Sequence, residues 1–186
     1  MIYEGLFAMG FPGSQRTVQR LVDAHYDDLY RYAFRLSGSA ADAEDLTQEA
    51  FCKAQANLAQ LRDPARARPW LFSILRNAYL HRVRSNHHVV SLDDVGDVPE
   101  PLGEPLPEID PVRLQQVLGE LPEPFRTPIV LYYFEDFSYR DIAEQMDLPL
   151  GTVMSRLARA KAFLRSRLLP GPAVASDGPG RATDGL

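Results

Sequence analysis

The strip of residues 91–111 constrains the fold of this chain more than any other feature. Its sequence, SLDDVGDVPEPLGEPLPEIDP, holds five prolines and two glycines, and residues 91–110 carry seven acidic side chains and no Lys or Arg. Proline lacks a backbone N–H and biases the preceding residue away from helix, and like charges along a chain repel one another. We therefore predict a flexible, extended linker at 91–110 between folded domains at 14–90 and 111–169.

The net charge of −5 hides an uneven distribution of charge along the chain. Residues 14–90 hold eleven Lys/Arg against eight Asp/Glu, and residues 111–169 hold eight against seven, so both predicted domains are slightly basic. Local clustering matters more than the total charge for binding a polyanion. The acidic average therefore does not exclude a nucleic-acid partner.

Both predicted domains carry apolar residues at helical spacing, and neither shows the period-two alternation of a half-buried strand. The fold class is therefore predicted as all-α, with two small helical domains, an irregular segment at 1–13 and a disordered tail at 170–186. The helices are predicted over residues 15–37, 39–58, 67–87, 111–120, 123–135, 139–146 and 149–168.

Local signals support several of these helix ends. Gly38 is suited to end the helix predicted at 15–37, and Ser39 is suited to cap the N-terminus of the helix that follows. Ser138 and Asp141 fit a reciprocal capping box. Pro149 is predicted in the first turn of the last helix, a position that tolerates proline.

Composition excludes several classes of protein. Cys52 is the one cysteine, so neither an intramolecular disulfide nor a cysteine-rich metal site can form. No apolar run approaches the ~20 residues that span a bilayer, and the N-terminal MIYEGLFAMGFPG lacks the pattern of a signal peptide. We therefore expect a cytoplasmic protein without membrane insertion. No nucleophile–base pair, metal cluster or phosphate loop is recognisable, so we expect no enzyme activity, cofactor or metal.

The segment SYRDIAEQMDLPLGTVMSRLARAKAFLRSRL carries the clearest functional pattern. A short helix, a tight turn and a longer basic helix form the helix-turn-helix layout, whose last helix docks in the major groove. The apolar side of this last helix would be packed, and its polar side would face base edges and phosphates. The residues predicted on the apolar side are Val153, Leu157, Ala160, Leu164 and Leu168. The alternative is a solvated basic face on a packed helical hairpin. The residues predicted on the polar side near the N-terminal end are Thr152, Ser155, Arg156 and Arg159.

Two further patterns lie in the first domain. In DAEDLTQEAF a polar stripe recurs at helical spacing, which indicates either an ordinary solvated face or an interface for a basic or polar partner. The stripe consists of Asp42, Asp45, Gln48 and Glu49. The segment ARARPWLFSILRNAYLHRVR interleaves arginines with aromatics, which suits single-stranded nucleic acid; alternatively, its aromatics are core residues and its arginines are solvated. For Trp70 alone, a place in the core is favoured over stacking on bases.

These segments together resemble bacterial sigma factors of the extracytoplasmic-function type, the minimal two-domain class. DAEDLTQEAF, RPWLFSILRNAYLHRVR and FRTPIVLYYFEDFSYRDIAEQMDLPLGTVMSRLARAK are similar to that family's signature segments. They occur in its order and at its spacing, and the resemblance spans residues 15–169. The resemblance implies a protein that binds core RNA polymerase, directs it to promoters and helps to melt the DNA.

The resemblance also implies roles for particular residues. The stripe of Asp42, Asp45, Gln48 and Glu49 would dock on the clamp helices of the polymerase largest subunit, and the second domain on the flap of the second-largest. The residues implied at the −10 element, where a base is flipped out of the non-template strand, are Arg66, Arg68, Arg76, Asn77 and Arg84. Those implied at the −35 element are Ser138, Tyr139, Thr152, Ser155, Arg156, Arg159 and Lys161.

Two other classes of protein stay open at this point. A stand-alone helix-turn-helix regulator would bind its operator without polymerase. A sigma-like decoy would sequester an anti-sigma factor and bind no DNA, but it should lack the basic helix that carries Arg156, Arg159 and Lys161. An anti-sigma factor is a further partner that the resemblance allows.

Overall fold

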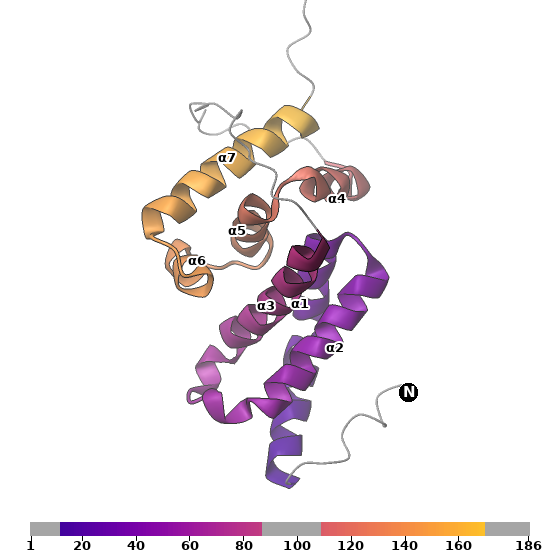
Figure 1. The fold of residues 1–186 in the computed structure, drawn as a ribbon, viewed down its shortest axis with the longest axis vertical. Helices are drawn as coiled ribbons and strands as arrows, with labels where there is room; N and C mark the ends of the chain where they lie inside the picture. The colour runs from indigo at the N-terminus through magenta and orange to yellow at the C-terminus, as the bar shows by residue number, and fades with distance from the viewer. Residues whose placement is uncertain (1–11, 87–108, 170–186) are drawn as a thin grey trace, which may run out of the picture.

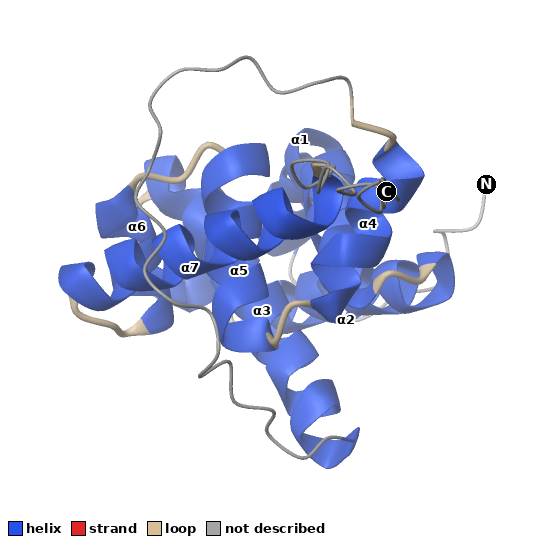
Figure 2. Ribbon diagram, turned by 90° about the horizontal axis from the view of Figure 1, so that it is seen from above, coloured by secondary structure: helices blue, strands red, loops and turns tan. Residues whose placement is uncertain are grey.

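The structure is a computed structural model that describes residues 12–86 and 109–169. Within these residues it contains seven α-helices, two short 3-10 helices and no strand, so the all-α prediction is confirmed (Figures 1 and 2). The first domain consists of α1 (Pro12–Ser37), α2 (Ala40–Ala56), η1 (Leu58–Gln60), η2 (Pro64–Arg66) and α3 (Ala67–Asn86). The second consists of α4 (Pro111–Glu120), α5 (Glu123–Phe134), α6 (Tyr139–Met146) and α7 (Leu150–Leu168).

Residues 91–108 of the predicted linker and the predicted tail at 170–186 lie outside the described residues. The last two residues of the predicted linker are described, and the second of them, Asp110, is the N-cap of α4. Most of the predicted segment 1–13 also lies outside the described residues, but its last two residues already belong to α1. The apolar spacing that predicted a helix from residue 15 gave no sign of this extra turn. Among the described residues, none of the helices combines the length and apolar character needed to cross a membrane.

The ends of the first-domain helices follow local sequence signals. Gly38 has a positive φ of 73°, a conformation that costs glycine little, and it ends α1. Ser39 caps α2 by accepting a hydrogen bond from the backbone N–H of Asp42 at 3.3 Å. Between α2 and α3 the chain turns through the two 3-10 helices, and the carboxylate of Asp63 accepts from the N–H of Ala65 at 2.9 Å.

In the second domain, the predicted capping box of Ser138 and Asp141 is present at the start of α6. Pro149 is the N-cap of α7 and does not lie in its first turn, which corrects the predicted helix start by one residue. The turn between α6 and α7 contains Asp147 with a left-handed φ of 53°. These signals set the helix-turn-helix geometry of α6 and α7.

The two domains pack against each other. The helices α4 and α5 contact α1, and α6 contacts α3, while α7 packs on α4, α5 and α6 (Figure 1). Buried side chains from both domains form one continuous core, which includes Tyr32 and Phe72 of the first domain and Ile129 and Leu131 of the second. The sequence predicted two helical domains but gave no indication of this close packing.

Candidate functional site

The helix α7 has one apolar and one polar face. Val153, Leu157 and Ala160 are buried in the core. On the other face Ser155 and Arg159 are exposed, and Thr152 and Arg156 are half-buried. The predicted candidates therefore lie at the surface near the N-terminal end of α7, where a helix docked in the major groove would meet base edges.

The three remaining candidates for the −35 element lie around this helix. Ser138 and Tyr139 are exposed at the start of α6. The hydroxyl of Ser138 is engaged in the capping box, and the ring of Tyr139 stacks on Tyr132 with ring centroids 4.8 Å apart. Lys161 is half-buried further along α7. The structure thus gives Ser138 a structural role that limits its freedom to reach DNA.

The acidic stripe of α2 is at the surface, and two of its members pair with basic side chains, Asp45 with Arg82 at 4.0 Å and Glu49 more closely. Asp42, Asp45 and Gln48 are exposed. Glu49 is half-buried and forms ion pairs with Lys53 at 2.7 Å and with Arg82 of α3 at 2.9 Å. The hydrogen bond from Lys53, aided by Arg82, lowers the pKa of the Glu49 carboxyl. The carboxylate therefore stays charged at neutral pH.

The aromatics of α3 belong to the core. Phe72 is fully buried and Tyr79 is 7% exposed, while Trp70 is half-buried and packs against the same core. The ring of Phe72 lies 4.8 Å from that of Tyr32 and 5.2 Å from that of Phe137. These aromatics could either stack on bases or pack in the core. For Phe72 and Tyr79 the core is confirmed, because their burial against α1 and the second domain leaves the ring faces inaccessible to bases.

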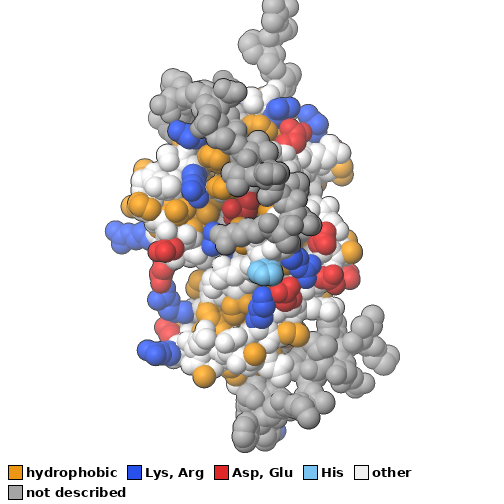
Figure 3. Space-filling model, in the orientation of Figure 1, with side chains coloured by type: hydrophobic (Ala, Val, Ile, Leu, Met, Phe, Trp, Pro, Cys, Tyr) orange, Lys and Arg blue, Asp and Glu red, His pale blue; other side chains and the backbone are white. Residues whose placement is uncertain are grey.

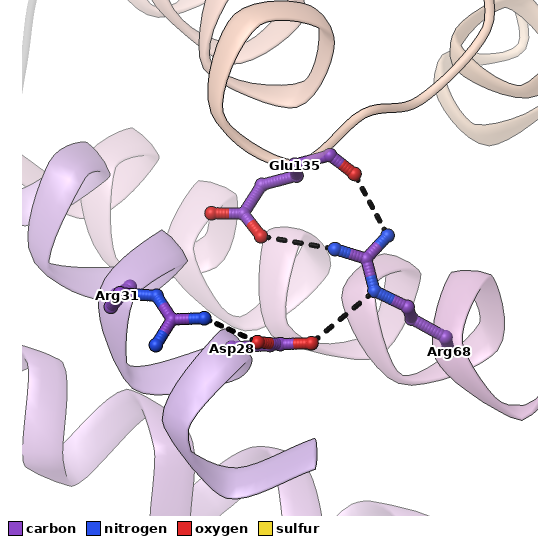
Figure 4. Close-up of polar contacts among 4 residues, drawn as sticks. All are labelled: Asp28, Arg31, Arg68 and Glu135. Atoms are coloured by element: carbon purple, nitrogen blue, oxygen red, sulfur yellow. Dashed lines mark hydrogen bonds and ion pairs between the residues drawn. The ribbon is translucent and has the colours of Figure 1, made fainter.

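Arg68, in the first turn of α3, meets the second domain at a buried carboxylate (Figure 4). Its guanidinium pairs with the carboxylate of Glu135 at 3.1 Å and donates to the backbone carbonyl of Glu135 at 2.8 Å. It also lies 3.4 Å from the carboxylate of Asp28 in α1, which pairs with Arg31. Glu135 itself is 2% exposed. Burial raises the pKa of Glu135 to about 7 although Arg68 acts to lower it.

Two other candidates for the −10 element also contact the second domain. The Nη2 of Arg66, in η2, donates to both carboxylate oxygens of Glu144 in α6, at 2.7 and 2.8 Å. Arg76 of α3 donates to the backbone carbonyl of Gln145 at 3.4 Å. Of the other two candidates, Asn77 is exposed, and the side chain of Arg84 lies outside the described part of the chain.

The sequence also matches known families. The profile described as Sigma-70 region 2 matches residues 21–89, and that described as Sigma-70, region 4 matches residues 112–164. The extracytoplasmic-function (ECF) sigma factor SigW of Bacillus subtilis is 32% identical over 170 residues, which cover 84% of this chain and 91% of SigW. The chain belongs to the extracytoplasmic-function sigma factors of the sigma-70 family.

This sigma factor has further relatives of the same kind. The ECF sigma factor SigL of Mycobacterium tuberculosis is 35% identical over 156 residues, which cover 81% of this chain and 88% of SigL. Among solved structures, the sigma factor RpoE of Bartonella quintana, in complex with the anti-sigma factor NepR, is 27% identical with a TM-score of 0.65. That likeness covers 81% of this chain and 96% of the other. This sigma factor therefore is a transcription initiation factor that directs RNA polymerase to promoters.

Sequence reasoning missed the residues that join the two domains of this sigma factor. Arg126 of α5 donates to the carbonyl of Leu36 at 2.6 Å and to the hydroxyl of Tyr79 at 3.0 Å. Gln115 of α4 donates to the carbonyl of Phe34 at 3.3 Å. These partners lie 47 to 90 residues apart in the sequence. No local pattern pairs residues at such distances, so nothing in the sequence alone identified them.

Proposed function

We propose that this sigma factor uses four surfaces, two that bind core RNA polymerase and two that bind promoter DNA. The acidic stripe of α2 docks on the clamp helices of the polymerase largest subunit, and the second domain contacts the flap of the second-largest. The −10 element is bound by Arg66, Arg68, Arg76, Asn77 and Arg84. The surface of α7 around Arg156 and Arg159 reads the −35 element. The protein, bound to polymerase, acts on promoter DNA in the cytoplasm.

The observation that carries this proposal is the two-faced character of α7. Its apolar face is buried against the second-domain core, whereas Ser155 and Arg159 are exposed and Arg156 is half-buried. Arginine is the side chain that most often contacts guanine edges in the major groove, and it also pairs with phosphates. The arrangement supports base reading by the start of this helix.

Run-off transcription tests the proposal as a whole. We expect the chain, added to core RNA polymerase on a library of genomic fragments, to start RNA synthesis at a discrete set of promoters. The chain alone should give no sequence-specific gel shift on those promoters. A specific shift without polymerase would favour a stand-alone helix-turn-helix regulator, and an inert chain that still binds an anti-sigma factor would favour a decoy.

The docking surface on α2 has its own test. We expect Asp45→Arg combined with Glu49→Arg to abolish retention of core polymerase in a pull-down, because the variant reverses the charge of the stripe. Asp42→Arg combined with Asp45→Arg changes two exposed side chains and avoids the half-buried Glu49. The matched control is Asp23→Arg with Asp27→Arg, a double reversal at exposed positions of α1. Full retention by both stripe variants would refute the assignment.

An anti-sigma factor is also proposed as a regulatory partner. The support is that RpoE of Bartonella quintana, which shares the fold, is solved with the anti-sigma factor NepR. Co-purification of a specific protein that blocks run-off transcription by this chain would be the expected result.

A further inference from the structure

The exposed side of α7 carries a row of apolar side chains beside the polar residues proposed to read the −35 element. Leu150, Met154 and Ala158 recur at every fourth position, so they lie one above another along the helix. Leu150 is 44% exposed, Met154 is 51% exposed, and Ala158 is also exposed. Hydrophobic side chains accordingly reach the surface over the beginning of α7, with basic side chains nearby (Figure 3). These three residues, hereafter the apolar strip, were not among the predicted DNA contacts.

The apolar strip borders the centre of the exposed side of α7. Successive residues of an α-helix are rotated by about 100° around its axis. By this rotation Ser155 and Arg159 lie opposite the side that is buried in the core. Met154 lies on one flank of that centre, and Arg156 lies on the other. The strip therefore forms one edge of the surface that Ser155 and Arg159 present to DNA.

An α-helix fills the major groove of B-DNA from one wall to the other. The helix with its side chains is about 10–12 Å across, and the groove is about 12 Å wide. A helix that lays Ser155 and Arg159 on the floor of the groove therefore brings both of its flanks against base pairs. The one apolar substituent that base edges present there is the C5-methyl group of thymine. Thymine methyl groups thus match the apolar strip in chemistry and in position.

We propose that Met154, with Leu150 beside it, contacts thymine methyl groups and so selects A·T base pairs in the −35 element. This inference rests on the proposed role of α7 in reading that element. Methionine suits this task because its side chain is unbranched and flexible and fits irregular apolar surfaces. Arg159 binds guanine edges or phosphates, so the polar centre and the apolar flank of one helix read different chemical groups of the promoter.

A protein partner is the other occupant that exposed apolar side chains suit. A protein that covered the strip would also cover the guanidinium of Arg159, which follows Ala158 in the chain. Such a partner would have to supply a carboxylate or carbonyl at that point, because a guanidinium buried without a partner is costly. The major groove supplies guanine edges, phosphates and thymine methyl groups together. The mixed character of the surface therefore favours DNA.

Replacement of thymine by uracil tests the proposal, because it removes the methyl group and leaves the base pairing unchanged. The test uses holoenzyme and a promoter found by run-off transcription. Each thymine of its −35 element, on either strand, is replaced in turn by deoxyuridine. We expect at least one replacement to weaken binding about fourfold, the effect of withdrawing one methyl group from apolar contact. No effect at any thymine, or a −35 element without A·T pairs, would overturn the proposal.

Met154→Ala tests whether this side chain holds the methyl group. The substitution removes an exposed side chain and introduces a strong helix former, so the fold should be preserved. We expect the variant to bind the thymine promoter as weakly as wild type binds the sensitive uracil promoter, and to be indifferent to the replacement. Leu150→Ala combined with Met154→Ala should lose any sensitivity that the single variant retains. A uracil effect of equal size in wild type and in the double variant would overturn the proposal.

Val112→Ala is the matched control. It removes an exposed apolar side chain, 65% exposed, from α4 of the same domain. We expect it to keep both the affinity and the uracil effect of wild type, and an equal loss of sensitivity in this variant would overturn the assignment to the strip. Sedimentation of the free chain at increasing concentration tests a second copy as the occupant. Association that Met154→Ala abolishes, together with indifference to uracil, would also overturn the proposal.

The outcomes separate this inference from the proposed function. If run-off transcription succeeds but uracil has no effect at any position, only the contact with thymine methyl groups fails. If the chain starts no transcript with core polymerase on any fragment, the proposed function fails, and the inference fails with it.

Discussion

The arginines of α3 and those of α7 are similar in sequence and different in their surroundings. Both helices carry basic side chains beside an apolar face, and both were predicted to bind DNA. Yet Arg68 is enclosed by the carboxylates of Glu135 and Asp28, whereas Arg159 is exposed. The difference arises because the second domain packs against α1 and α3 and leaves the outer face of α7 at the surface.

This comparison shows that accessibility is not a property of a residue type or of its helical position. A guanidinium can bind a phosphate or a carboxylate with the same bidentate geometry. Where a carboxylate of the same chain is near, an arginine that suits DNA becomes a structural contact. The two groups of arginines should therefore differ in how strongly they affect the stability of the free chain.

Arg68→Ala gives the largest expected effect. We expect it to lower the free energy of unfolding by about 2 kcal/mol, because it leaves the buried carboxyl and the backbone carbonyl of Glu135 without the guanidinium that donates to both. Chemical denaturation of the free chain measures the loss. The matched control, Arg66→Ala, breaks an exposed pair and should cost only about 0.5 kcal/mol. Equal losses in the two variants would remove the distinction between a buried and an exposed contact.

Arg156→Ala and Arg159→Ala should show the opposite behaviour. We expect each to weaken binding of holoenzyme to the −35 element by ~1–3 kcal/mol per lost base contact. The free energy of unfolding should change by no more than about 0.5 kcal/mol, since neither side chain is buried. Footprinting on a promoter from the run-off assay measures the first effect. Arg113→Ala, exposed on α4, is the control, and a footprint identical to wild type in both test variants would contradict the assignment.

A smaller effect is expected from pH. Burial raises the pKa of Glu135 from its ordinary 4.5 to about 7, so the folded chain holds a proton that the unfolded chain releases. The stability contributed by Glu135 is therefore fully present below about pH 4.5 and is lost as pH rises through about 7. The charged groups around this carboxyl are Arg68, Asp28, Arg31 and Arg35.

The comparison of wild type with Glu135→Gln isolates this contribution. His25, whose pKa is lowered by burial, adds stability as pH rises and acts in the opposite direction over part of the same range. We expect the difference in unfolding free energy between the two proteins to change between about pH 4.5 and 7 and to be flat above. Denaturation curves across this range give the measurement, and a constant difference would contradict the role of Glu135.

The sequence by itself determined the helices and much of their boundaries. The capping box of Ser138 and Asp141 and the stop at Gly38 involve residues a few positions apart, so their geometry is encoded locally. Helical periodicity likewise placed Val153 and Leu157 on the buried face of α7. The family's signature segments, recognised by their order and spacing along the chain, were enough to indicate promoter recognition.

Only the tertiary structure decided which surfaces are open. Periodicity shows that α3 has an apolar side but not what packs on it, so it could not place Phe72 between Tyr32 and Phe137. The partners Arg68 and Glu135 are separated by 67 residues and by the acidic strip. Arg68 and Glu135 pair only because the two domains dock in one particular arrangement. Many weak contacts between residues distant in the sequence determine this arrangement, and no local sequence pattern specifies them.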